Sequence, residues 1–175
     1  MSVRSDPLAE IRRLGRPGDL GWVVLAHGEQ YATEFGWDTE CEALVTRIVA
    51  DYADSPEPDA EAAWIAEHDG ARVGCVFCVR DAEPGVARLR LLLVTDEGRG
   101  HRLGSRLLDA SLAFARDAGY ARVRLWTNDP LVAARRLYLD RGFVLTDEAP
   151  HRSFGRELVG QTYERALTRS SGRAG

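Results

Sequence analysis

The chain has 175 residues, of which 45% are apolar and 29% charged, and its formal charge at pH 7 is -4. This balance is typical of a folded globular protein and excludes a disordered chain. We expect a single domain over residues 1–175, with a core of about 10–167. The negative charge gives no general attraction to nucleic acid or to a membrane surface, so neither is an expected partner. All 23 basic residues are arginine, which excludes mechanisms that need a lysine.

The expected elements follow helical and strand periodicities in turn. They are a strand (10–18), two helices (19–36 and 38–54), a hairpin (62–81), a strand (86–95), a helix (105–119), a strand (121–129), a helix (130–142) and two strands (143–150 and 158–167). Asp19 and either Asp38 or Thr39 are the expected N-caps of the first two helices, and Pro130 the expected first residue of the last helix. Asp69–Gly70 is the expected hairpin turn.

The order of these elements predicts the fold class. A strand, a helix and a second strand between residues 86 and 129 imply a parallel neighbouring pair. Hairpins on either side imply antiparallel pairs, so we expect a mixed α/β sheet with flanking helices. The apolar run at 86–95 suggests a strand that is buried on both faces.

The cysteines and the termini bear on the cellular compartment. Three cysteines cannot all form disulfides with one another, and Cys75 and Cys78 face opposite sides of an expected strand, so we expect neither a metal nor a redox pair. The N-terminus lacks an apolar segment of signal-peptide length, and no run approaches the ~20 apolar residues of a membrane span. These features predict a cytoplasmic protein. Residues 1–9 and 169–175 are polar and expected to be frayed.

The junction between the strand at 86–95 and the following helix has the composition of a phosphate-binding turn. Gly100 and Gly104 allow a ligand to approach the backbone, and Arg99 and Arg102 offer guanidinium groups for phosphate oxygens. The helix start adds free N–H groups and a partial positive charge, and Ser105 a hydroxyl. The alternative is a tight turn that needs glycine, with arginines that face water.

Two phosphate ligands compete for this turn. Gly98, Gly100 and Gly104 loosely imitate a dinucleotide fingerprint, and Asp129 lies about where a ribose-binding carboxylate is expected. The G-x-G-x-x-G spacing is not met, however, and the turn lies past the middle of the chain. A nicotinamide-dinucleotide site therefore stays the weaker alternative.

Two motifs resemble those of the GNAT-type N-acetyltransferases. The signature Q/R-x-x-G-x-G/A is matched by Arg99–Gly104, except that Arg102 replaces the middle glycine. The block A-x-x-L-Y-x-x-x-G-F is present without a break at Ala134–Phe143. The element order from Glu10 to Leu167 also resembles this family. The segments "LWTNDPLVAARRLY" and "HRSFGRELVGQTYE" are particularly similar to the acetyltransferase half of proteins that fuse a MarR-type domain to a GNAT domain.

The resemblance implies a GNAT-like acyl-CoA N-acyltransferase fold, a mostly antiparallel sheet whose parallel pair splays around acetyl-CoA. The diphosphate would lie on the signature turn, with the Arg102 side chain pointing outward to phosphate, and the pantetheine arm along the central strand. Asn128 would contact the cofactor or cap the next helix. The implied cofactor-binding residues are Leu92, Leu93, Val94, Arg99, Gly100, His101, Arg102, Leu103, Gly104, Ser105 and Asn128.

The resemblance also implies direct attack of an amine on acetyl-CoA, without an acyl-enzyme and without a metal. Tyr138 in the second block would protonate the leaving thiolate, unless it only packs against the sheet. The base is not identified; a bound water is one candidate, and the side-chain candidates are Glu29, Glu34, Asp38, Glu40, Glu148 and His151. The aromatic residues that could line an acceptor pocket are Tyr31, Phe35, Trp37, Trp126 and Phe154.

These expectations describe an enzyme that acetylates a primary amine of a small molecule or a peptide. The acidic balance of the chain favours a small or cationic acceptor. A non-catalytic acyl-CoA sensor remains an alternative, as does the nicotinamide-binding protein. Family members often dimerise, so a homodimer is also expected.

Overall fold

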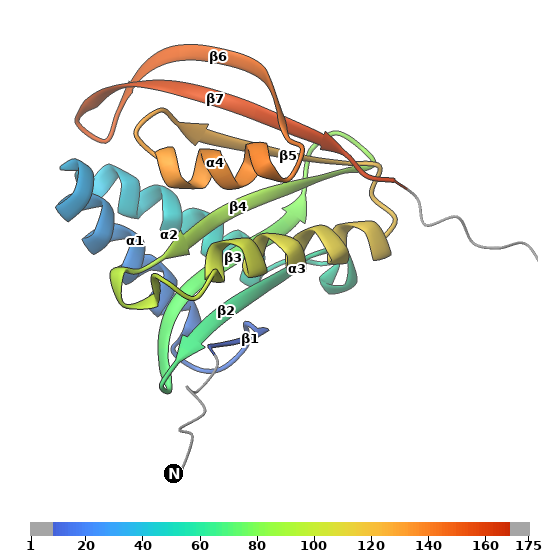
Figure 1. The fold of residues 1–175 in the computed structure, drawn as a ribbon, viewed down its shortest axis with the longest axis horizontal. Coiled ribbons are helices and arrows are strands. Elements are labelled where there is room, and N and C mark those ends of the chain that lie inside the picture. The colour runs from blue at the N-terminus through green and yellow to red at the C-terminus, as the bar shows by residue number, and fades with distance from the viewer. Residues whose placement is uncertain (1–8, 169–175) are drawn as a thin grey trace, which may run out of the picture.

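The computed structural model describes residues 9–168 and consists of seven strands and four α-helices (Figure 1). Their order is β1 (Glu10–Arg13), α1 (Asp19–Phe35), α2 (Thr39–Ala53), β2 (Ala62–His68), β3 (Ala71–Arg80), β4 (Val86–Val94), α3 (Leu103–Asp117), β5 (Arg122–Asn128), α4 (Val132–Asp140), β6 (Val144–Ser153) and β7 (Arg156–Ala166). The fraying expected at 1–9 and 169–175 falls outside the described residues, except at Ala9, which is buried.

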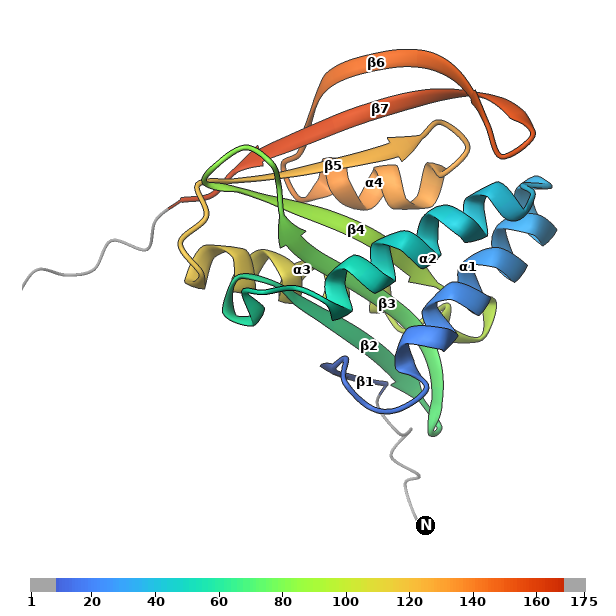
Figure 2. The ribbon, with the colours of Figure 1, turned by 180° about the vertical axis from the view of Figure 1, so that it is seen from behind.

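The strands form one sheet in the order β1-β2-β3-β4-β5-β7-β6. Only β4 and β5 are parallel, with α3 as the crossover between them, and every other neighbouring pair is antiparallel. The predicted mixed α/β sheet is therefore confirmed. Helices α3 and α4 cover one face of the sheet (Figure 1), and α1 and α2 cover the other (Figure 2).

Two apolar layers follow from this arrangement. The α3 layer, between the sheet and α3, includes the buried stripe Leu103, Leu107, Leu108, Leu112 and Ala115, which repeats at helical spacing. The α1/α2 layer lies on the opposite face of the sheet. Cys78 belongs to the first layer and Cys75 to the second, so the two thiols are free and separated by the sheet, as the strand spacing predicted.

Strand β4 changes its character halfway along. Its pairing with β5 is confined to Val86–Leu89 opposite Arg122–Leu125, and beyond these residues the two strands part. On its other side, between the pairs Phe77↔Arg90 and Cys75↔Leu93, β3 advances two residues and β4 three. This extra residue is a bulge, and Leu91 within it has a φ of 57°. Leu89 and Leu93 are buried on opposite faces of the sheet, as predicted for this strand, whereas Leu91, Leu92 and Val94 are only half-buried.

The helix and turn signals were right at two places and wrong at two others. Asp38 caps α2 by accepting from the Glu40 N–H at 3.0 Å, and both residues of the Asp69–Gly70 turn have positive φ. Asp19 is not an N-cap: Gly18 occupies that position, and the Asp19 carboxylate is engaged by distant arginines. Pro130 is not the first helical residue either, because α4 begins two residues later.

Candidate functional site

The parting of β4 and β5 opens a cavity of about 600 Å³, here called the splay cavity. Its walls come from the end of β4, the turn before α3, the start of α4 and the end of α1. Most of the predicted cofactor-binding residues line it, namely Leu92, Leu93, Val94, Arg99, Gly100, Arg102, Leu103 and Gly104. Because β4 lacks a β5 partner in this stretch, its main chain faces the cavity with an unpaired edge.

The turn before α3 departs from the signature at Arg102. This residue is the N-cap of α3 and has a φ of 54°, a left-handed conformation that glycine adopts freely and that costs other residues roughly 1–2 kcal/mol. Its side chain is exposed, as expected for an outward-pointing guanidinium. Gly104 serves packing as well, because a Cβ there would lie 2.7 Å from Cδ1 of Leu137. A larger residue would therefore require the Leu137 side chain to move.

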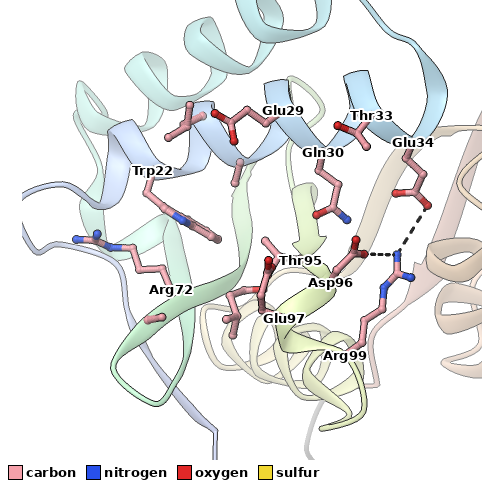
Figure 3. A pocket seen from close by; sticks show the side chains of 14 residues that line it. Trp22, Glu29, Gln30, Thr33, Glu34, Arg72, Thr95, Asp96, Glu97 and Arg99 are labelled. Atoms are coloured by element: carbon pink, nitrogen blue, oxygen red, sulfur yellow. Dashed lines mark hydrogen bonds and ion pairs between the residues drawn. The ribbon is translucent and has the colours of Figure 1, made fainter.

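The two arginines of the turn differ in their partners. The Arg99 guanidinium lies between two carboxylates, 3.0 Å from Asp96 and 3.8 Å from Glu34, as Figure 3 shows. Within residues 9–168, no carboxylate lies at ion-pair distance from Arg102. Arg102 is thus the residue whose charge is free for an anionic ligand, whereas Arg99 would have to share or exchange its partners.

Three of the predicted cofactor-binding residues lie elsewhere. His101 packs on the ring of His68, with the two ring centroids 4.3 Å apart, and Ser105 is half-buried on α3 outside the cavity lining. Asn128 does not cap α4: its Oδ1 accepts from Nε2 of His151 at 2.7 Å. These contacts are made between segments far apart in the sequence, so no local pattern indicated them.

A second cavity, of about 410 Å³, lies between the sheet and α1/α2 and is here called the aromatic cavity. Four of the predicted aromatic residues line it: Tyr31, Trp37, Trp126 and Phe154. Three of these rings contact one another in a series, with centroids 5.1 Å apart for the edge-to-face pair Tyr31–Trp37 and 4.9 Å for the tilted pair Trp37–Phe154. Phe35, the fifth, lines the splay cavity instead.

The splay cavity and the aromatic cavity meet. Tyr31, Leu92, Leu131 and Ala134 line both of them. Tyr138 is 6% exposed and belongs to the wall of the aromatic cavity, one helical turn after Ala134. Burial raises the pKa of Tyr138 well above its ordinary value, so the phenol keeps its proton at neutral pH and can act as a proton donor.

None of the predicted side-chain bases lines the aromatic cavity. Asp38 caps α2, and Glu40 accepts from the Phe154 N–H at 3.0 Å. Glu148 is exposed on β6, and His151 is bonded to Asn128 and to Ser153. The remaining two, Glu29 and Glu34, line a third cavity.

This third cavity, of about 580 Å³, lies between α1 and the end of β4 and is here called the α1 cavity (Figure 3). Gln30 spans its edge and donates to the main-chain oxygen of Val94 at 3.2 Å. Gln30, Glu34 and Arg99 also line the splay cavity, so the two are adjacent. The carboxylates around the α1 cavity are largely exposed or already paired with Arg99, so it does not add a base to the aromatic cavity.

The aromatic cavity contains titratable residues that sequence reasoning missed: His27, Arg88 and Arg90. His27 is buried, its Nδ1–H donates to the Val23 oxygen at 2.7 Å, and its Nε2 has no hydrogen-bond partner among residues 9–168. Burial lowers the pKa of His27 to about 4, so Nε2 is a neutral acceptor at physiological pH. A signal for the arginines existed, because residues two apart on a strand share a face.

Two further observations concern the described part of the chain. Between residues 9 and 168, no group of three or more His, Cys, Asp or Glu side chains is placed to hold a metal ion. None of the helices in that range combines the length and apolar character that crossing a membrane requires.

Comparison with known proteins agrees with this architecture. The acetyltransferase (GNAT) family matches residues 21–143. An uncharacterized N-acetyltransferase of Schizosaccharomyces pombe is 28% identical over 123 residues, which cover 70% of this chain and 76% of the relative. N-acetyltransferase 8B of Rattus norvegicus is 36% identical over 89 residues, 49% of this chain but only 40% of the relative, so the match spans well under half of that protein.

A solved structure extends the likeness to the whole fold. An acetyltransferase of Salmonella typhimurium, determined with its cofactor acetyl-CoA, superposes with a TM-score of 0.72 at 19% identity, covering 94% of this chain and 96% of that one. At this identity the likeness concerns the fold, including the mostly antiparallel sheet with one parallel pair. The match of the family over most of the chain is decisive: the protein belongs to the GNAT family of acetyltransferases.

Proposed function

We propose that this protein transfers the acetyl group of acetyl-CoA to a primary amine of a small molecule or a peptide. One observation carries the proposal: the splay cavity and the aromatic cavity meet beside the unpaired edge of β4, with Tyr138 in the wall. A cofactor and an acceptor that entered from the two sides would come together at that point. The homodimer and the cytoplasmic location remain predictions.

The residues of the splay cavity fit acetyl-CoA, which when bound supplies an acetyl group activated as a thioester. The unpaired edge of β4 at Leu92–Val94 offers main-chain groups to the amides of an extended pantetheine arm. The free N–H groups at the start of α3, together with the Arg102 guanidinium, suit a diphosphate. Leu103 and Leu137 supply apolar contact for the arm.

The chain's residues then have separate tasks in the transfer. A main-chain N–H of Leu92–Val94 polarises the carbonyl under attack. Tyr138, protonated because it is buried, donates its proton to the departing thiolate. Since the carboxylates of the described residues do not line the aromatic cavity, the amine's proton passes to water.

Thermal unfolding with acetyl-CoA, CoA and NADPH added separately tests the cofactor. A ligand that binds only the native state stabilises it by about 2.7 kcal/mol at 100 times its Kd. We expect both CoA species to raise the melting temperature and NADPH to leave it unchanged. A larger shift with NADPH would favour the nicotinamide alternative instead.

A panel of amines with detection of released thiol tests the reaction itself. We expect amine-dependent release of CoA that the Tyr138→Phe variant reduces. Binding of acetyl-CoA without turnover of any amine, and without an effect of that substitution, would identify an acyl-CoA sensor. The two experiments together separate the cofactor from the chemistry.

A further inference from the structure

Two arginines of β4 give the aromatic cavity a positive wall. Arg88 and Arg90 lie two residues apart on the strand, are half-buried and line this cavity together. Leu89 between them belongs to the α3 layer, so both arginines face the α1/α2 side of the sheet. Among the residues that the structure describes, no carboxylate lies at ion-pair distance from either guanidinium.

A third arginine, on the neighbouring strand, differs from these two because it has carboxylate partners. Arg124 on β5 is directly opposite Arg88 in the parallel register. Its guanidinium binds Glu164 at 2.6 Å, Glu83 at 2.7 Å and Asp81 at 3.1 Å. The charge of Arg124 is therefore compensated within the protein, whereas the two arginines in the cavity wall keep theirs.

The environment of Arg90 disfavours its charge. Burial and the neighbouring Arg88 lower the pKa of Arg90 to about 10, although Asp51 and Asp81 act in the opposite direction from a distance. At neutral pH the group is still protonated. Two like charges in a half-buried wall are stabilised when an anion binds between them, because the anion restores both the lost hydration and the charge balance.

We infer that the acceptor amine also carries an anionic group, as an amino acid carries its carboxylate, and that Arg88 and Arg90 bind this group in the aromatic cavity. The inference rests on the proposed acetyl transfer and names its acceptor more narrowly. Leu92 lies where the two cavities meet, and Arg90 precedes it by two residues, which is about 7 Å along a strand. The anion would therefore lie within the length of a small molecule from the reacting amine. The local lining thus outweighs the net charge of the chain, which had favoured a cationic acceptor.

The test compares matched acceptors that differ only in the anion. Aminoalkanoates whose carboxylate lies at increasing distance from the amine are assayed against their carboxamides, with aminoalkylphosphonates as a second anionic series. Thiol release gives kcat/KM for each. The amine of an α-amino acid carboxamide is less basic than that of the acid, so a larger fraction of it is unprotonated and able to attack at neutral pH. A preference for the acid of that pair therefore cannot arise from amine reactivity.

We expect the wild type to prefer at least one acid over its carboxamide by about tenfold or more, the range of a charge-assisted hydrogen bond. Arg88→Gln and Arg90→Gln should each collapse this ratio, and Arg90→Lys should restore part of it. Arg47→Gln, which removes an exposed guanidinium on α2, is the matched control and should keep the ratio. Preference for the phosphonates over the carboxylates would assign the anion as a phosphate-like group.

The outcomes separate this inference from the proposed function. If carboxamides are turned over as well as every acid, or if the ratio survives both glutamine variants, the anion site is wrong while acetyl transfer stands. If no amine is turned over, thermal unfolding with CoA present tests whether the anion site exists. The acids must then raise the melting temperature of the wild type more than their carboxamides do. This advantage must be lost in the Arg90→Gln variant. Equal stabilisation by both would overturn it. Protection of each variant by acetyl-CoA checks that the fold is intact.

Discussion

Two groups of arginines in this protein differ in how their charges are compensated. At the β1 end of the sheet, Arg12 and Arg72 both lie 2.8 Å from the fully buried carboxylate of Asp19. In the aromatic cavity, Arg88 and Arg90 have no such partner among the described residues. The first group is closed on itself and contributes stability, whereas the second is open and suited to a ligand. The same side chain thus serves the fold in one region and the proposed function in the other.

The closed group extends beyond its ion pairs. Asp19 also accepts from the N–H groups of Gly15 at 3.0 Å and Arg16 at 2.9 Å. Its hydrogen bonds, that from Arg12 first, hold the pKa of Asp19 far below its ordinary value. Through one carboxylate, β1, the following turn, α1 and β3 are tied together, so changes here should affect stability first.

The largest loss of stability is expected from Asp19→Asn. Removing the charge leaves Arg12 and Arg72 without their shared partner, which typically costs about 3–5 kcal/mol for a buried ion pair. Denaturant unfolding measures the change. The control is Asp109→Asn, which breaks an exposed pair with Arg141 and should cost at most about 1 kcal/mol. Equal losses in the two variants would refute the structural role of Asp19.

In the open region, Tyr138→Phe should lower kcat while leaving the fold intact. Loss of a general acid reduces the rate by about 10²–10⁴-fold. Tyr163→Phe is the matched control, because Tyr163 is buried in the same layer, with its ring centroid 6.4 Å from that of Tyr138. We expect full kcat in the control and similar denaturant midpoints in both. An unchanged kcat in Tyr138→Phe would show that the tyrosine only packs.

His27 should make stability depend on pH in a narrow window. The unfolded chain protonates this residue near pH 6.5, but the folded protein does so only at about pH 4. The unfolded state therefore takes up the proton first on acidification, and the free energy of unfolding falls by about 3 kcal/mol across the window. Denaturant unfolding at a series of pH values measures the slope.

The His27→Leu variant should lose this slope between about pH 6.5 and pH 4, and His101→Asn should keep it. The stability that the Asp19 carboxylate contributes is lost only at more acidic pH, because the pKa of that carboxyl in the folded protein lies below its ordinary value. A slope that persists in His27→Leu would mean that another group titrates in the window.

The smallest effect on stability is expected from Arg102→Gly. Glycine relieves the cost of the left-handed backbone in the folded state, but it also gives the unfolded chain more conformational freedom. These two effects on the free energy of unfolding nearly cancel, to within about 1 kcal/mol. Affinity for acetyl-CoA should nevertheless fall several-fold, and its salt dependence should weaken. Arg116→Gln at the far end of α3 controls for net charge. Affinity unchanged at every salt concentration would exclude a contact from the Arg102 side chain to phosphate.

Local patterns predicted the parts of this fold that depend on neighbours in the chain. The parallel pair around α3 and the Asp69–Gly70 turn were correct because periodicity and turn chemistry act over a few residues. Asp19 was mistaken for a cap because its partner Arg72 lies 53 residues away. The cap proposed for Asn128 was wrong for the same reason, since its partner His151 is 23 residues further along, whereas its contact to the cofactor stays a prediction.

The candidate site was predictable to a similar extent. Most of the residues predicted from the signature turn and the central strand line the splay cavity, and four of the five predicted aromatic residues line the aromatic cavity. The acidic candidates do not line the aromatic cavity: Asp38 caps the backbone of α2, and Glu29 and Glu34 line the α1 cavity instead. Arg88 and Arg90 were overlooked because an apolar run around them suggested burial, not a charged wall. The closer resemblance to MarR/GNAT fusion proteins remains a prediction.

The bulge at Leu91 determines which side of the sheet each later residue of β4 faces. Arg90 and Leu91 point to the same side, so even-numbered residues face α1/α2 before the bulge and odd-numbered residues after it. Deleting Leu91 would restore strict alternation and leave Leu92 facing the α3 layer and Leu93 facing α1/α2, as they do now. A one-residue deletion elsewhere in β4, with the bulge kept, would instead turn the residues on one side of it to the opposite face of the sheet, so length variation among relatives should fall at the bulge or in surface hairpins such as β6–β7.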